Sequence, residues 1–214
     1  MAFVDRPDAG RQLAQHLVAR DLRDPVVLGL PRGGVPVAYE VARVLDAPLD
    51  VILVRKLGAP AQPELALGAI GADGVRLVNR PLVRSLRVTD EALAGIEARE
   101  RATMEEQARR FRGGRPVEPL EGRTAVVVDD GVATGATARA ACEVAAGRRP
   151  AGVVLAVPVA ARRVLAELRR SLDVVCVQAP IFLQAVGPWY EHFDQTSDEE
   201  VVRLLERRAR DRSA

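Results

Sequence analysis

Short apolar runs alternate with stretches of helical spacing along most of this chain. The apolar runs lie at residues 26–30, 51–54, 124–128, 153–157 and 174–177. The spacing predicts helices between and before them, at about residues 8–22, 35–45, 136–146 and 160–171, with Asp8 as the cap of the first. Continuous apolar strands separated by helices are typical of a parallel sheet with both faces covered. We therefore expect an α/β fold with a parallel sheet of about five strands and helices on both faces.

Two further helices carry clear start signals. Thr89 is placed to cap a long helix reaching Phe111, and Ser197 with Glu200 forms a capping box for a closing helix. The apolar stripe of the long helix is thin and consists of Leu93, Ile96, Met104 and Phe111. Such a stripe indicates a solvated helix that touches one neighbour. We therefore expect a homodimer, in which this stripe finds a partner.

Residues 56–74 read KLGAPAQPELALGAIGADG, where proline and glycine interrupt any regular pattern. A connection of this length inside a small domain is usually functional. We predict an irregular, mobile lid over about residues 55–75.

Length, composition and charge limit the class of protein. A chain of 214 residues that is 48% hydrophobic fits one domain, 1–214, with its core over about residues 8–178. Cys142 and Cys176 are too few for a disulfide framework or a zinc site. A net charge of +2 disfavours nucleic acid as a partner. The longest apolar run, residues 151–161, is too short to span a membrane, and the first residues do not resemble a signal peptide, so we expect a cytoplasmic protein.

The segment AVVVDDGVATGAT, residues 125–137, combines the features that a phosphorylated sugar requires. A strand delivers Asp129 and Asp130, which we place on a surface loop, and a loop of small residues then opens directly into a helix. Backbone N–H groups, threonine hydroxyls and the positive end of a helix dipole bind phosphate. The two acids suit vicinal sugar hydroxyls or a hydrated magnesium ion. Neither G-x-G-x-x-G after the first strand nor G-K-[ST] is present, which disfavours dinucleotide binding and nucleoside-triphosphate hydrolysis.

This segment resembles the phosphoribosyl diphosphate signature of the type I phosphoribosyltransferases, with Gly131 where the family usually has an aliphatic residue. PRGGVPVA at residues 31–38 is similar to the family's diphosphate loop, in which glycines present backbone N–H groups. VRKLGAP at 54–60 with ELALG at 64–68 is similar to the mobile loop of adenine-type members. These segments follow the family's order across residues 26–178.

The resemblance implies magnesium-dependent transfer of ribose 5-phosphate from phosphoribosyl diphosphate to a nitrogen acceptor, such as a nucleobase, with release of diphosphate. It implies that Asp129 and Asp130 hold the sugar diol and that Mg²⁺ arrives with the substrate, with few direct protein ligands. The residues implied for the 5-phosphate are Ala133, Thr134, Gly135, Ala136 and Thr137, and those for the diphosphate are Arg32, Gly33, Gly34, Arg55 and Lys56. Lys56, the only lysine, is the implied catalytic cation. Members that act on 6-oxopurines typically have aspartate where this chain has Ala133, whereas adenine-type members have alanine.

The chain is only 3% aromatic, yet Phe182, Trp189, Tyr190 and Phe193 lie in one short window after the last strand. The family closes its site there with a variable hood, here residues 178–196. Phe182, Trp189 and Tyr190 are then candidates to stack on the acceptor base. The alternative is a small hydrophobic cluster that anchors the closing helix.

Two other functions remain open for the same fold. One is a regulator that senses phosphoribosyl diphosphate or a nucleotide without transfer chemistry. The other is an RNA-binding regulator, which the charge balance disfavours.

Overall fold

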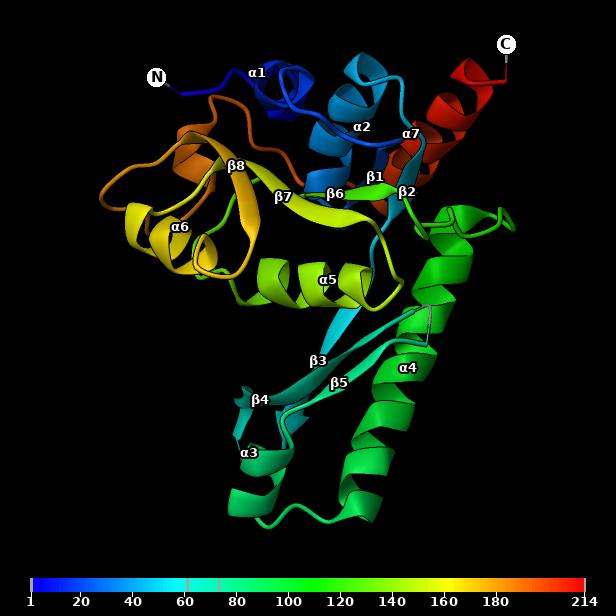
Figure 1. The fold of residues 1–214 in the computed structure, drawn as a ribbon, viewed down its shortest axis with the longest axis vertical. Coiled ribbons are helices and arrows are strands. Elements are labelled where there is room, and N and C mark those ends of the chain that lie inside the picture. The colour runs from blue at the N-terminus through cyan, green and yellow to red at the C-terminus, as the bar shows by residue number, and fades with distance from the viewer. Residues whose placement is uncertain (1, 61, 73, 214) are drawn as a thin grey trace.

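The computed structural model describes residues 2–60, 62–72 and 74–213. Its main sheet has five parallel strands in the order β2-β1-β6-β7-β8 (Figure 1). The strands are β1 (Val26–Gly29), β2 (Leu49–Val51), β6 (Thr124–Val128), β7 (Gly152–Val159) and β8 (Asp173–Gln178). The predicted α/β fold is confirmed.

Helices cover both faces of this sheet. Helices α1 (Arg6–Val18) and α2 (Gly34–Val44) lie on one face, and α5 (Ala136–Ala146) and α6 (Arg162–Leu168) lie on the other (Figure 1). Successive residues of β6 point to opposite faces, so Val126 packs with the α1 and α2 side chains while Val127 packs with those of α5. Both faces are buried, which explains why the strands read as continuous apolar runs.

Helix α1 begins earlier than its sequence pattern indicates. Its N-cap is Asp5, whose Oδ1 accepts a hydrogen bond from the amide of Asp8 at 2.7 Å. The prediction that Asp8 caps a helix reaching residue 22 was wrong, because Asp5 followed by proline in the first turn gives the stronger start signal. As a result, Arg6 is the first residue of the helix.

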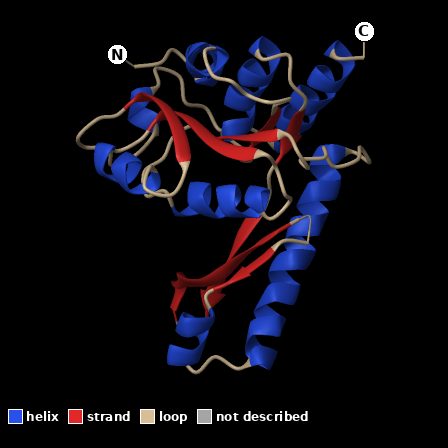
Figure 2. Cartoon of the chain, in the orientation of Figure 1, coloured by secondary structure: helices blue, strands red, loops and turns tan. Residues whose placement is uncertain are grey.

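Most of the predicted irregular segment forms a second, antiparallel sheet, so the prediction that residues 55–75 lack regular structure was wrong. That they form a mobile lid stays a prediction. Its strands are β3 (Val54–Ala59), β4 (Gln62–Gly71) and β5 (Arg76–Val78), and α5 packs between the two sheets (Figure 2). Glycine does not break these strands: a Cβ on Gly68 would lie 2.1 Å from the Leu77 carbonyl oxygen, so glycine permits a close backbone approach. Residues 61 and 73 of the predicted lid lie outside the described residues.

The long helix α4 (Asp90–Arg112) follows α3 (Arg80–Ser85) and is capped by Thr89 as predicted. Its stripe is not left to solvent: Leu93, Met104 and Phe111 are buried in one cluster with residues of β3, β4 and α7 (Asp198–Asp211). Most other side chains of α4 are exposed or half-buried, as predicted for a solvated helix, but the stripe contacts both the second sheet and α7 instead of one neighbour. A homodimer stays a prediction, but this stripe no longer supports it. Ser197 caps α7 as predicted, after a short 3-10 turn, η1 (Gly187–Trp189).

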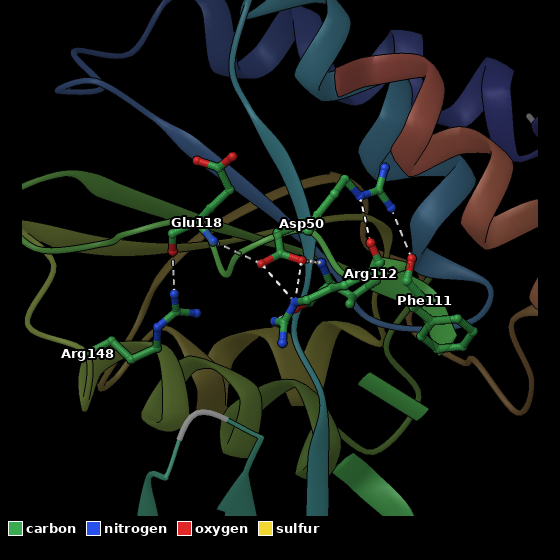
Figure 3. A network of polar contacts seen from close by, with 7 residues as sticks. Asp50, Phe111, Arg112, Glu118 and Arg148 are labelled. Carbon is green, nitrogen blue, oxygen red and sulfur yellow. Dashed lines mark hydrogen bonds and ion pairs between the residues drawn. The ribbon is translucent and has the colours of Figure 1, made fainter. Parts of the chain in front are cut away.

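A buried ion pair ties the end of α4 to the start of β2 (Figure 3). Arg112 Nε donates to Asp50 Oδ1 at 3.0 Å, and the two side chains are 8% and 5% exposed. Asp50 also accepts hydrogen bonds from the amides of Val51 and Glu118 at 2.7 and 3.2 Å. One carboxylate therefore joins a strand, a helix end and the loop before β6.

We predict that Asp50→Asn destabilises the protein by about 3 kcal/mol, because removing one member of a buried ion pair leaves a desolvated charge behind. For a domain of this size the melting temperature falls by about 6–12 °C. Thermal unfolding followed by circular dichroism measures the change. Asp173→Asn, which breaks an exposed ion pair with Arg20, serves as the control and changes stability little. Equal melting temperatures for both variants would contradict the prediction.

Candidate functional site

Two loops meet at the carboxyl ends of β1 and β6, which are neighbours in the sheet. After β1 the chain passes to β2 on one side, and after β6 it passes to β7 on the other. Such a switch point is where open α/β sheets bind ligands. A Cβ on Gly34 would lie 2.7 Å from the Val128 carbonyl oxygen, and one on Gly33 would lie 2.1 Å from Asp130 Oδ2. Only glycine allows the loop after β1 to approach the acids this closely.

The two acids are held by different partners. Asp130 Oδ2 accepts a hydrogen bond from Arg6 Nε at 2.9 Å, and its carbonyl oxygen accepts one from the Tyr190 hydroxyl at 2.5 Å. Asp129 Oδ1 accepts the amide of Asp130 at 2.9 Å. The expectation that both acids lie on a surface loop was wrong: the Asp130 side chain is only 15% exposed, because Arg6 and the loop after β1 cover it.

Burial and mutual repulsion act on the protonation of this pair. Burial raises the pKa of Asp129 well above its usual range, and the neighbouring Asp130 carboxylate raises it further. Burial also raises the pKa of Asp130, and the Arg6 guanidinium opposes that rise. Arg6 thus favours the ionised form of both acids, although one cation cannot balance two carboxylates.

The loop of small residues leads into the first turn of α5. Gly135, at φ 81°, precedes the helix, and no side chain caps the helix amides. Thr134, Gly135 and Ala136 line a cavity of about 650 Å³, whose other walls come from β4, β5 and α6. Ala136 and Thr137 are exposed and Ala133 is half-buried. Uncapped helix amides beside threonine hydroxyls suit a phosphate group.

The structure separates the basic residues predicted for diphosphate. Lys56 lines the same cavity as Thr134 and Gly135, across from the loop predicted to bind the 5-phosphate. Arg55, next to it on β3, points to the opposite side, where its Nη2 donates to Gln107 Oε1 at 3.4 Å. The side chain of Glu64, from the same predicted mobile loop, lies outside what the structure describes.

Arg32 contacts the start of α7. Its Nη1 lies 3.6 Å from Asp198 Oδ1, and Arg110 of α4 binds the other oxygen of that carboxylate at 2.5 Å. The Gly34 amide donates to the Leu30 carbonyl at 3.0 Å, so it is not presented to a ligand as the family resemblance implied.

The aromatic residues after β8 differ in their exposure. The Tyr190 ring is buried between Phe3 and Phe193, with ring centroids 5.4 and 5.0 Å away, which leaves no face for a base. Trp189 packs partly against the same cluster. This cluster anchors the N-terminal segment, not the closing helix as one interpretation of the sequence proposed. Phe182 is 86% exposed and remains a predicted stacking ring.

Sequence reasoning missed Arg6. Its place in the site depends on a contact with Asp130 across 124 positions of the chain, which no local pattern reveals. The need of the two acids for a cation follows from their burial, which the sequence did not indicate.

No group of three or more His, Cys, Asp or Glu side chains that could hold a metal occurs in residues 2–60, 62–72 and 74–213. The acid pair nevertheless fits a magnesium ion that arrives with phosphates, because Mg²⁺ needs only one or two carboxylates when phosphates and water supply the rest. Two half-buried carboxylates that share one cation, Arg6, leave negative charge for such an ion. Within the described part of the chain, no helix is both long enough and apolar enough to cross a bilayer.

Known proteins resemble this chain along most of its length. The family model described as the phosphoribosyl transferase domain matches residues 5–192. Two Mycobacterium tuberculosis proteins, named "Putative phosphoribosyl transferase Rv0571c" and "Putative phosphoribosyl transferase MT0597", are each 54% identical over 210 residues. These residues are 98% of this chain and 47% of each relative, so the chain spans about half the length of these curated relatives.

A solved structure agrees over the whole fold. The crystal structure of TT1426 from Thermus thermophilus is 45% identical, covers 96% of this chain and 98% of its own, and superposes with a TM-score of 0.88. The family resemblance drawn from the residues after β1 and β6 is confirmed: the chain belongs to the phosphoribosyl transferase domain family.

Proposed function

We propose that this protein transfers ribose 5-phosphate from phosphoribosyl diphosphate to a nitrogen acceptor, either a nucleobase or a related small molecule, and releases diphosphate. The observation that carries the proposal is the meeting of the acid pair with the glycine loop after β1 and the uncapped start of α5. A ligand held there needs both a diol and a phosphate. Family membership supports phosphoribosyl transfer in general.

Catalysis in this proposal consists of positioning and charge stabilisation. Asp129 and Asp130 bind the ribose hydroxyls, and residues 133–137 bind the 5-phosphate, so the anomeric carbon is fixed between them. The transition state is an oxocarbenium-like sugar with negative charge growing on the departing diphosphate. A magnesium ion carried by the substrate, held near Asp129 and Asp130, would neutralise part of that charge. The acceptor nitrogen attacks the opposite face, with inversion.

A second candidate is a regulator that binds phosphoribosyl diphosphate without transferring its sugar. The favouring observation is that Arg32, the cation of the predicted diphosphate loop, is already paired with Asp198. A leaving group that meets a neutralised arginine gains less stabilisation as its charge grows.

Diphosphate release separates the two candidates. On mixing the protein with magnesium phosphoribosyl diphosphate and a panel of nucleobases, we expect release matched one to one by the nucleotide formed from one acceptor. Calorimetric binding of the substrate without release across the panel would instead support the regulator.

Asp129 should lower the stability of the free protein at neutral pH, although transfer requires it. The folded pKa of Asp129 is above its unfolded value, so this group favours folding at low pH and opposes it once the pH passes the folded pKa. Asp129→Asn should therefore abolish transfer yet raise the neutral-pH melting temperature by about 2–4 °C, for about 1 kcal/mol. The gain should shrink as the pH falls.

Asp130→Asn should have the opposite effect on stability, because it leaves Arg6, whose side chain is 10% exposed, without a carboxylate. We expect a loss of about 2 kcal/mol, which lowers the melting temperature by about 4–8 °C, together with loss of transfer. Differential scanning calorimetry measures the shift in melting temperature of both variants. Shifts of the same sign would contradict this description of the pair.

Lys56 tests which phosphate the cavity holds. A cation beside the 5-phosphate binds ground state and transition state alike, so Lys56→Gln should raise KM for phosphoribosyl diphosphate about tenfold or more, with kcat little changed. Steady-state kinetics measures both constants, with Arg76→Gln on β5 as the matched loss of charge. A fall in kcat with KM unchanged would instead indicate that Lys56 acts on the departing diphosphate.

The acceptor class follows from Ala133. Because 6-oxopurine members of the family typically have aspartate at this position, we predict negligible turnover of hypoxanthine and guanine, and turnover of adenine or a non-purine acceptor. The nucleobase panel tests this directly, and efficient turnover of guanine would refute it.

A further inference from the structure

Arg6 lies where four segments that are distant in sequence meet. Its Nε donates to Asp130 Oδ2 at 2.9 Å and its Nη1 donates to the Asp194 carbonyl at 2.6 Å. Its guanidinium carbon lies 3.8 Å from the centroid of the Phe193 ring. A Cβ on Gly33 would lie 3.2 Å from Arg6 Nε. One side chain therefore contacts the acid loop and the aromatic window and abuts the loop after β1.

Backbone hydrogen bonds also join the segment before Arg6 to the segment after β8. Phe3 donates its amide to the Trp189 carbonyl at 2.8 Å, and its own carbonyl accepts the Glu191 amide at 2.8 Å. The His192 amide donates to the Val4 carbonyl at 2.9 Å. Residues 189–194, which we name the strap, thus run beside the N-terminal segment. The strap reaches Asp130 through both Arg6 and the Tyr190 hydroxyl.

We propose that Arg6 is a positioning residue for the transfer reaction: it orients Asp130 toward the sugar, and it fixes the strap to that acid. This inference rests on the proposed function. Arg6 binds Oδ2 of Asp130 and leaves Oδ1 outside the ion pair, so the ion pair fixes the direction of the second oxygen.

The geometry requires arginine and not merely a positive charge. The planar guanidinium donates to a carboxylate and to a carbonyl from two nitrogens while its face rests on Phe193. An ammonium group could replace the charge at Asp130, but it could not reach Asp194 and cover the ring at the same time. Arg6→Lys therefore removes the guanidinium geometry and keeps the charge, whereas Arg6→Gln removes both.

The test compares Arg6→Gln, which removes the charge, with Arg6→Lys, which keeps it, and with Arg20→Gln as control. Arg20 follows the same helix and loses an ion pair with Asp173, remote from the acids. Calorimetry with magnesium phosphoribosyl diphosphate measures the affinity of each variant at neutral pH. We expect Arg6→Gln to weaken binding about tenfold, because Asp130 loses its charge-assisted hydrogen bond.

Arg6→Lys keeps one donor for Asp130 but cannot also reach Asp194, so its affinity should lie between those of wild type and Arg6→Gln, and amide hydrogen exchange in the strap should rise in both variants. Arg20→Gln should change neither. Wild-type affinity in Arg6→Gln overturns the positioning of Asp130, and unchanged exchange in Arg6→Lys overturns the coupling to the strap. If Arg6→Gln does not fold, Arg6→Lys tests both roles, and wild-type affinity or wild-type exchange in that variant overturns the corresponding role.

Failure of the proposed function gives a different result. If wild-type protein binds no phosphoribosyl diphosphate at any pH, the transfer reaction is excluded. Strap exchange still reports whether Arg6 joins the strap to the acid. Unchanged exchange in both Arg6 variants would then overturn this inference on its own.

Discussion

Two adjacent carboxylates begin the loop after β6 and face the loop after β1, and Arg6 is the cation that pairs with Asp130 within the described part of the chain. The remaining architecture of the site is arranged around this buried charge. Glycine at positions 33 and 34 lets one loop close over the acids, and α1 begins early enough to bring Arg6 beneath them. Tyr190 then fixes the backbone of the second acid.

This charge imbalance connects the stability of the fold to its function. A site with two acids and one cation opposes its own burial, and a ligand that brings hydroxyl donors and a cation relieves that opposition. Sites of this kind lower the stability of the free protein, and ligand binding restores that stability. The second sheet adds a wall opposite the start of α5, and α4 and α7 hold that wall beside the main sheet.

Local patterns predicted the main sheet well because its strands are buried on both faces and its helices carry capping residues such as Thr89 and Ser197. They also located both loops of the candidate site, because each loop carries its own motif, whereas the adjacency of β1 and β6 came from the structure. The second sheet was missed because Gly68 and its neighbours suggest a loop, and only the partner strand shows that glycine permits close pairing. Arg6 and the burial of the α4 stripe depend on contacts between distant segments, which periodicity does not contain.

Amide hydrogen exchange with and without magnesium phosphoribosyl diphosphate tests most directly that the junction of these loops is the ligand site. We predict that the substrate slows amide exchange in both residues 31–35 and residues 131–138, and that Asp129→Asn abolishes both effects while the protein stays folded. Protection confined to another surface, or protection of both loops that survives in Asp129→Asn, would contradict it.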